Sequence, residues 1–80
     1  SVVKIPFEKA LSLFKENLGV LFPSEKVSDG FVILQTFNKK TEWNFKYIST
    51  SIKFLNIKLS AENGSVDSYQ AINLLDKGKK

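Results

Sequence analysis

The chain has 80 residues, 42% of them hydrophobic, and its twelve lysines against eight acidic residues leave a net charge of +4. A chain of this length has room for one small core and buries only about 60% of the surface that its unfolded form exposes. The absence of Cys excludes a disulfide framework and thiolate metal sites, and the absence of His removes the commonest general base.

The first part of the chain predicts one amphipathic helix over residues 7–18. Pro6 suits the first helical turn, because its fixed φ is close to the helical value. Gly19 stands where a left-handed C-terminal cap is expected. Apolar side chains recur at the i, i+3, i+4 spacing that places them on one helical face: Phe7, Ala10, Leu11, Phe14 and Leu18.

Four later segments predict strands. Residues 31–37 are rich in β-branched and aromatic side chains, and residues 43–47 and 55–60 alternate apolar with polar positions. Residues 66–69 begin a fourth strand, with apolar content continuing to Leu75, and residues 1–5 could add a short edge strand. Residues 24–30, with an Asp-Gly pair, indicate the loop between helix and sheet.

Two polar segments predict hairpin connections. Residues 38–41 supply a loop between the first two long strands. The pair Asn63-Gly64 favours a type I′ turn, which requires positive φ at both central positions, and it should join the third and fourth strands.

These elements predict an α+β fold, a single N-terminal helix packed on an antiparallel sheet of three to four strands. One domain should cover residues 1–75, with residues 76–80 as a disordered or added basic tail. We expect the chain to be a processed protein or a segment of a longer one, because it lacks Met. No apolar run reaches the roughly 18 to 20 residues that span a bilayer, so we expect no direct membrane insertion.

The aromatic strand has two interpretations. Its side chains share one face, where they could stack nucleic-acid bases beside neighbouring lysines, or could form the core beneath the helix. A one-helix domain needs that face for its core, which favours the second interpretation and leaves Asn44, Lys46, Asn56 and Lys58 facing solvent. The predicted core residues are Phe7, Leu11, Phe14, Trp43, Phe45 and Tyr47.

Three segments resemble the PepSY superfamily, especially its YcdB/YcdC repeats. They are Phe-Glu-Lys-Ala at residues 7–10, Trp-Asn-Phe-Lys-Tyr at 43–47, and Ile-Lys-Leu-Ser-Ala-Glu-Asn-Gly-Ser-Val at 57–66. The resemblance covers residues 5–71 and implies a PepSY/cystatin-like layout. It further implies an extracytoplasmic location, in the cell envelope or secreted, and a role in inhibiting or chaperoning proteases. It carries no catalytic residues.

The residues themselves predict no enzyme. The four glycines are isolated turn residues and form no phosphate-binding loop, and no nucleophile elbow or Ser-Lys dyad motif occurs. The eight acidic residues lack EF-hand spacing, so we expect neither a metal site nor a cofactor. Scattered lysines without a single arginine argue against specific nucleic-acid recognition.

The favoured hypothesis is therefore a non-catalytic protein-interaction module outside the cytoplasm. Its partner would be a protease domain or a neighbouring repeat, and a homodimer could form through a sheet edge. The strand predicted to bind carries Phe31, Ile33, Gln35 and Phe37. The alternative is a passive spacer domain in a multidomain bacterial surface protein or lipoprotein.

Overall fold

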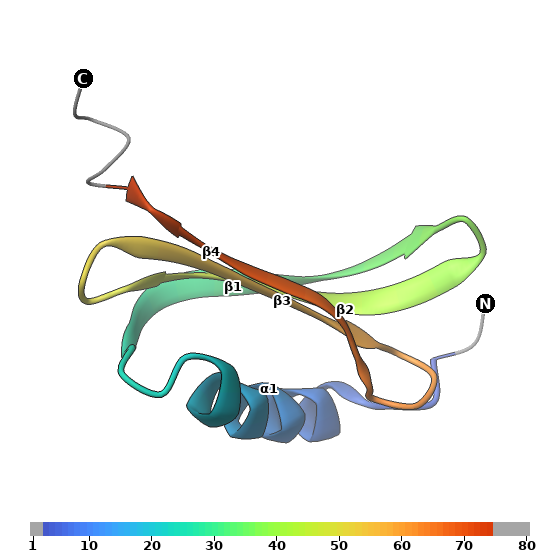
Figure 1. Ribbon diagram of the computed structural model, residues 1–80. Coiled ribbons are helices and arrows are strands. Elements are labelled where there is room, and N and C mark those ends of the chain that lie inside the picture. The colour runs from blue at the N-terminus through green and yellow to red at the C-terminus, as the bar shows by residue number, and fades with distance from the viewer. Residues whose placement is uncertain (1–2, 75–80) are drawn as a thin grey trace.

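The structure, a computed structural model, describes residues 3–74 and shows the predicted α+β layout with four strands. Helix α1 lies against one face of an antiparallel sheet whose strands follow in chain order, β1-β2-β3-β4 (Figure 1). Among the described residues no element covers the other face, which we call the open face. The elements are α1 (Phe7–Leu21), β1 (Val27–Phe37), β2 (Lys40–Ser49), β3 (Lys53–Ser60) and β4 (Val66–Asn73).

The core lies between α1 and the middle of the sheet. Ala10 and Phe14 are the buried residues of the helix, and the small side chain of Ala10 lets the helix approach the strands closely. Opposite them, the alternating positions of β2 and β3 bring Phe45, Ile57 and Leu59 to the same face, and each is fully buried. Period two in the strands and period 3.6 in the helix thus meet in one apolar layer.

Helix α1 continues past the predicted end at Leu18. Gly19 lies inside the helix and not at its cap, and the helix closes with the N–H of Phe22 donating to the carbonyl of Leu18 at 2.9 Å. Leu21 and Phe22 still pack against the core. The extra turn therefore buries apolar surface, which outweighs the unfavourable helical propensity of glycine.

The N-terminal edge strand expected over residues 1–5 is absent from residues 3–6, the described part of the approach to the helix. This segment instead crosses the end of the sheet. The N–H groups of Lys4 and Ile5 both donate to the carbonyl of Ala61, at 2.8 and 2.9 Å, and the indole Nε1 of Trp43 donates to the carbonyl of Ile5 at 2.9 Å. These bonds hold the start of α1 beneath β2 and the β3–β4 connection.

Strand β1 begins at Val27, inside the segment predicted to be a loop. Contacts with the β2–β3 turn extend the pairing: the carbonyl of Lys26 accepts from the N–H of Thr50 at 2.7 Å. Glu25 accepts from Ser51 Oγ at 2.6 Å and from Lys53 Nζ at 2.9 Å. The pairing of β1 with β2 is irregular between Val27 and Asp29, and this irregularity accommodates the polar residues at the start of β1.

The turn chemistry differs from the prediction. Asn38 and Lys39 form the two-residue turn with positive φ at both positions, 54° and 63°. Such a turn matches the right-handed twist of the strands that it joins. In the β3–β4 connection, residues 61–65, Gly64 has positive φ whereas Asn63 does not, so the predicted type I′ turn at Asn63-Gly64 is wrong.

Candidate functional site

Strand β1 forms one free edge of the sheet, because the strand order places it outermost. It is the longest of the described strands, with 11 residues, and within residues 3–74 it pairs only with β2 (Figure 1). The residues from Gly30 to Phe37 carry no charge and no proline. Natural sheets usually protect such an edge with lysine, proline or a bulge, and β1 has none of these along that stretch.

The pairing of β1 with β2 determines which backbone groups remain free. A two-residue turn makes its flanking pair, Phe37 and Lys40, exchange hydrogen bonds, after which bonded and non-bonded pairs alternate. The N–H of Ala61 donates to the carbonyl of Thr41 at 2.9 Å. The backbone carbonyl of Thr41 therefore points away from β1, as this alternation requires. The outward-facing N–H and C=O groups of β1 therefore belong to Gly30, Val32, Leu34 and Thr36.

The predicted binding residues lie together along this edge. Phe31, Ile33, Gln35 and Phe37 alternate along β1 on the open face. Phe31 and Phe37 have exposed fractions of 57% and 71%. Leu34 is also 44% exposed, on the helix side of the sheet, where α1 leaves it uncovered. Apolar side chains thus flank the free backbone groups on both faces.

A shallow hollow of about 260 Å³ lies beside the first half of β1. Phe31 borders it together with Ile48 and Phe54, and the lining is completed by Asp29, Gly30, Lys46 and Tyr47. Gly30 belongs to the same region. A Cβ on Gly30 would lie 2.5 Å from the ring of Tyr47, so this ring covers the glycine from the helix side.

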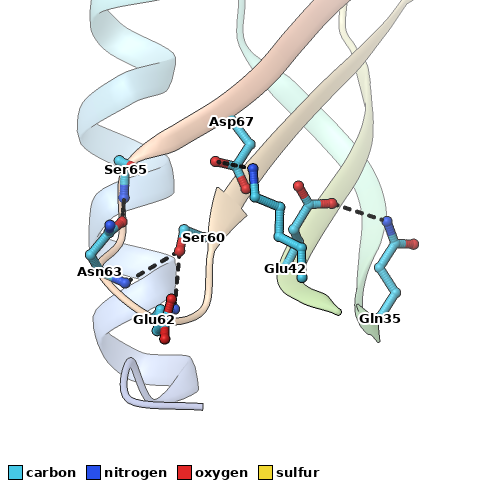
Figure 2. A network of polar contacts seen from close by, with 8 residues as sticks. Gln35, Glu42, Ser60, Glu62, Asn63, Ser65 and Asp67 are labelled. Carbon is cyan, nitrogen blue, oxygen red and sulfur yellow. Dashed lines mark hydrogen bonds and ion pairs between the residues drawn. The ribbon is translucent and has the colours of Figure 1, made fainter. Parts of the chain in front are cut away.

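The opposite edge, β4, is protected at its start. A register shift falls between Lys58 and Leu59 of its partner strand, so one residue of β4 bulges out of the ladder. Asp67 lies at that bulge, where its carboxylate is 3.6 Å from Lys40 Nζ (Figure 2). A bulge and a charge are two of the devices that prevent strand addition. β1 has a comparable irregularity beside Asp29, but the uncharged stretch that follows the bulge is longer on β1, residues 30–37, than on β4, residues 68–73.

Figure 2 shows the polar network at the end of the sheet near β4. Gln35 Nε2 donates to Glu42 Oε1 at 3.4 Å. Burial raises the pKa of Glu42, and the neighbouring Asp67 carboxyl raises it further. In the β3–β4 connection, Ser60 Oγ accepts from the N–H groups of Glu62 and Asn63, at 3.1 and 3.3 Å. These contacts organise the connection and supply no nucleophile paired with a base.

The aromatic strand forms core and not a stacking platform. Phe45 has no exposed surface, and the rings of Phe14 and Tyr47 lie with centroids 5.1 Å apart. Trp43 and Leu11 pack against the core while partly exposed. Phe7, predicted as core, is 40% exposed because it lies in the first turn at the margin of the helix, although its ring still contacts Trp43, with centroids 5.8 Å apart.

The open face is less exposed than predicted. Asn44 retains only 2% of its surface, since Gln35 Oε1 accepts from its Nδ2 at 3.2 Å and its Oδ1 accepts from Asn56 Nδ2 at 2.6 Å. Amides on three adjacent strands thus satisfy one another across the face. The alternation of β2 correctly predicts the face on which Asn44 lies, but cross-strand neighbours determine its burial.

Sequence reasoning missed Leu34 and Gly30 as parts of this edge. Leu34 belongs to a continuous apolar run that hides the face on which each residue lies. The pair Asp29-Gly30 instead predicts a turn. An isolated glycine beside an apolar strand also indicates close backbone approach, which is the signal that could have identified it.

Within residues 3–74, no group of three or more acidic side chains is placed to hold a metal ion. No helix in that part of the chain has the length and apolar character needed to cross a bilayer. Comparisons with protein families, with curated proteins and with solved structures find no match to this chain. The resemblance to PepSY-like repeats therefore stays a prediction.

Proposed function

We propose that this domain is a non-catalytic protein-interaction module, which binds an extended segment of a partner protein as an additional strand along β1. The unprotected edge of β1 carries the proposal. Its outward groups at Gly30, Val32, Leu34 and Thr36 offer a ready row of donors and acceptors. In strand addition, such main-chain bonds supply affinity, and the side chains at alternate positions supply specificity.

The flanking side chains define the segment that would bind. On the open face, an added strand would lie beside Phe31, Ile33 and Phe37, and on the helix side beside Leu34, all exposed. No charged side chain stands between Gly30 and Phe37 to pair with a charge on the partner. The favoured ligand is therefore an extended, largely apolar and uncharged segment, since unpaired charges would lose hydration there.

The resemblance to PepSY-like repeats supports a class of partner. We propose a protease domain or a neighbouring repeat of the same protein, encountered outside the cytoplasm, with inhibition or chaperoning of the protease as the outcome. A passive spacer is the competing function. The exposed apolar side chains beside the free backbone groups of β1 favour the interaction module, because a spacer would gain nothing from exposing them.

The test compares two proline substitutions. Leu34→Pro removes an outward N–H from β1 while leaving the bonds to β2 in place. Continuing the alternation across β3 makes Asn56 and Gln70 a bonded pair, so the N–H of Ala71 points outward from β4. Ala71→Pro is then the matched control on the other edge.

Binding of the domain to a panel of secreted proteases and to neighbouring repeats should be measured by calorimetry, with protease inhibition followed in parallel. We expect saturable binding that Leu34→Pro weakens at least about tenfold, the effect of losing roughly one hydrogen bond of 1.4 kcal/mol. Ala71→Pro should bind as the unmodified chain does. Equal binding by both variants would refute strand addition at β1, and an absence of binding across the panel would favour the spacer.

A further inference from the structure

We infer that β1 of one copy pairs antiparallel with β1 of a second copy, about a twofold axis at Val32, joining two four-stranded sheets into one continuous sheet. The inference rests on the proposed function in one respect: it takes β1 to be a strand acceptor. It adds that a second copy of the chain occupies the edge of β1 and that the two strands pair in a single register. The edge is then covered before any other partner binds.

The backbone alternation restricts how two copies can meet. Outward groups can bond only to outward groups, so Gly30, Val32, Leu34 and Thr36 of one copy must oppose members of the same set in the other. All four lie on the helix side of the sheet. Residues directly opposite each other in a sheet share a face, and so both α1 helices lie on the same face of the joined sheet.

Side-chain matching selects one register among those allowed. With Val32 on the axis, Gly30 opposes Leu34 of the second copy, and Phe31 opposes its Ile33. The exposed side chain of Leu34 then lies against Gly30 of the second copy, which has no side chain. It lies next to the Tyr47 ring that covers this glycine. Asp29 opposes Gln35, so polar and apolar positions are matched on the open face as well.

The neighbouring registers match less well. An axis at Ile33 places Phe31 against Gln35 and Asp29 against Phe37, so apolar rings meet polar groups. An axis at Leu34 places Ile33 against Gln35 and Val32 against Thr36. Both alternatives also form apolar pairs, Val32 with Leu34 or Phe31 with Phe37, but each sets other apolar side chains against polar ones, which the axis at Val32 avoids.

Charge also favours a second copy at β1 and not at β4. The segment from Gly30 to Phe37 is neutral, so self-pairing brings no like charges together. On β4, Asp67 and the bulge beside it would oppose a second copy. The dimer is consequently closed: each copy offers one edge, which the other copy covers.

The first experiment is sedimentation equilibrium of the purified domain over a wide range of concentration. We expect a concentration-dependent twofold increase in molar mass. Ile33→Lys places a charge opposite Phe31 of the second copy and should weaken the dimer at least about tenfold, the effect of roughly 1.4 kcal/mol. Gln70→Lys, an exposed position on the same face of β4, is the matched control and should dimerise as the unmodified chain does.

The register is tested with single cysteines, which the cysteine-free chain allows. Val32→Cys should form a disulfide-linked dimer, because residues on the axis have Cα atoms about 5.5 Å apart. Leu34→Cys should not, since its two copies would lie about 13 Å apart along the strands. Efficient cross-linking at Leu34 and not at Val32 would overturn the register. A chain that stays monomeric, or a dimer that Ile33→Lys leaves intact, would overturn the inference.

These outcomes are distinguishable from those for the proposed function. A monomeric chain whose partner binding is lost in Leu34→Pro would refute self-pairing and leave strand addition standing. A β1 dimer that binds no protease and no neighbouring repeat would refute the proposed partners and leave self-pairing standing. When both hold, the apparent affinity of the unmodified chain for its partner should fall as the concentration of the domain rises, because self-pairing and partner binding compete for one edge.

Discussion

The ring of Phe14 on α1 lies stacked on the ring of Phe45 on β2, with centroids 4.4 Å apart and an angle of 4° between the planes. Both residues are buried, at 3% and 0% exposure. The pair joins the single helix to the centre of a sheet that has no second covering layer among the described residues. Aromatic pairs add about 0.5–1.5 kcal/mol beyond the surface that they bury, so this contact anchors α1.

Phe45→Ala should therefore cost about 3–5 kcal/mol in the free energy of unfolding, the usual range for an aromatic residue lost from a core. A domain of this size has a total stability of roughly 4–12 kcal/mol, so much of the population should unfold at moderate temperature. Phe37→Ala, at a position 71% exposed, is the control and should change stability by less than about 0.5 kcal/mol. Urea unfolding measures both. Similar losses in the two variants would contradict the assigned core.

Two glycine substitutions should act in opposite directions. Gly19 lies inside α1, and a Cβ there would meet nothing within 4 Å, so Gly19→Ala should stabilise the domain by about 0.5–1 kcal/mol through helix propensity. Gly64 has a φ of 82°, and its Cβ would lie 2.7 Å from Leu13 Cδ1. Gly64→Ala should destabilise by more than about 1 kcal/mol. In thermal unfolding, the melting temperature should be higher for Gly19→Ala and lower for Gly64→Ala than for the unmodified chain. A higher melting temperature for Gly64→Ala would contradict this structure of the β3–β4 connection.

Glu25 should make stability depend on acid pH. Hydrogen bonds from Ser51 and then Lys53 lower its pKa from 4.5 to about 2. Because the folded-state pKa is below the unfolded value, the carboxylate's contribution is complete above about pH 4.5 and is lost as pH falls towards 2. The difference in unfolding free energy between the unmodified chain and Glu25→Gln should shrink over that window. A difference that is independent of pH would show that Glu25 does not hold the β2–β3 turn through its charge.

Glu42 should have the opposite pH dependence. Burial and then the nearby Asp67 carboxyl raise its pKa, so its charged form is the disfavoured one in the folded state. A raised pKa contributes stability at low pH that is lost as pH rises through the folded-state value. Glu42→Gln, which keeps an oxygen for Gln35, should therefore be more stable than the unmodified chain at pH 7, with the gain vanishing in acid. Denaturant titrations at several pH values measure this, and a loss of stability at pH 7 would contradict the raised pKa.

The existence and order of the elements could be predicted from periodicity because both signals are local. One helical face through Ala10 and Phe14 and the alternation through Phe45 and Ile57 each specify the side that must be buried. The boundaries of the helix and strands could not be predicted in this way. α1 runs through Gly19 because Leu21 and Phe22 still find the core, and β1 begins at Val27 because the β2–β3 turn pairs with it.

The turns also depend on contacts that the local sequence does not reveal. Asn63-Gly64 has the stronger local preference for a type I′ turn, yet Asn38-Lys39 adopts positive φ at both positions. The β3–β4 connection instead takes a longer path, in which the carbonyl of Ala61 holds the N-terminal segment and Gly64 packs on Leu13. Long-range contacts there outweigh the preference of the dipeptide.

By itself, the sequence determined that this chain forms one helix on an antiparallel sheet and lacks the side chains of the commonest catalytic and metal sites. It also placed Phe31, Ile33, Gln35 and Phe37 on one strand. Only the tertiary structure decided that this strand is an edge, that Leu34 is exposed beside it, and that a bulge lies at the start of β4. The physical reason is that residue spacing specifies the face on which a side chain lies, whereas the partner of a strand depends on pairings between residues far apart in the chain.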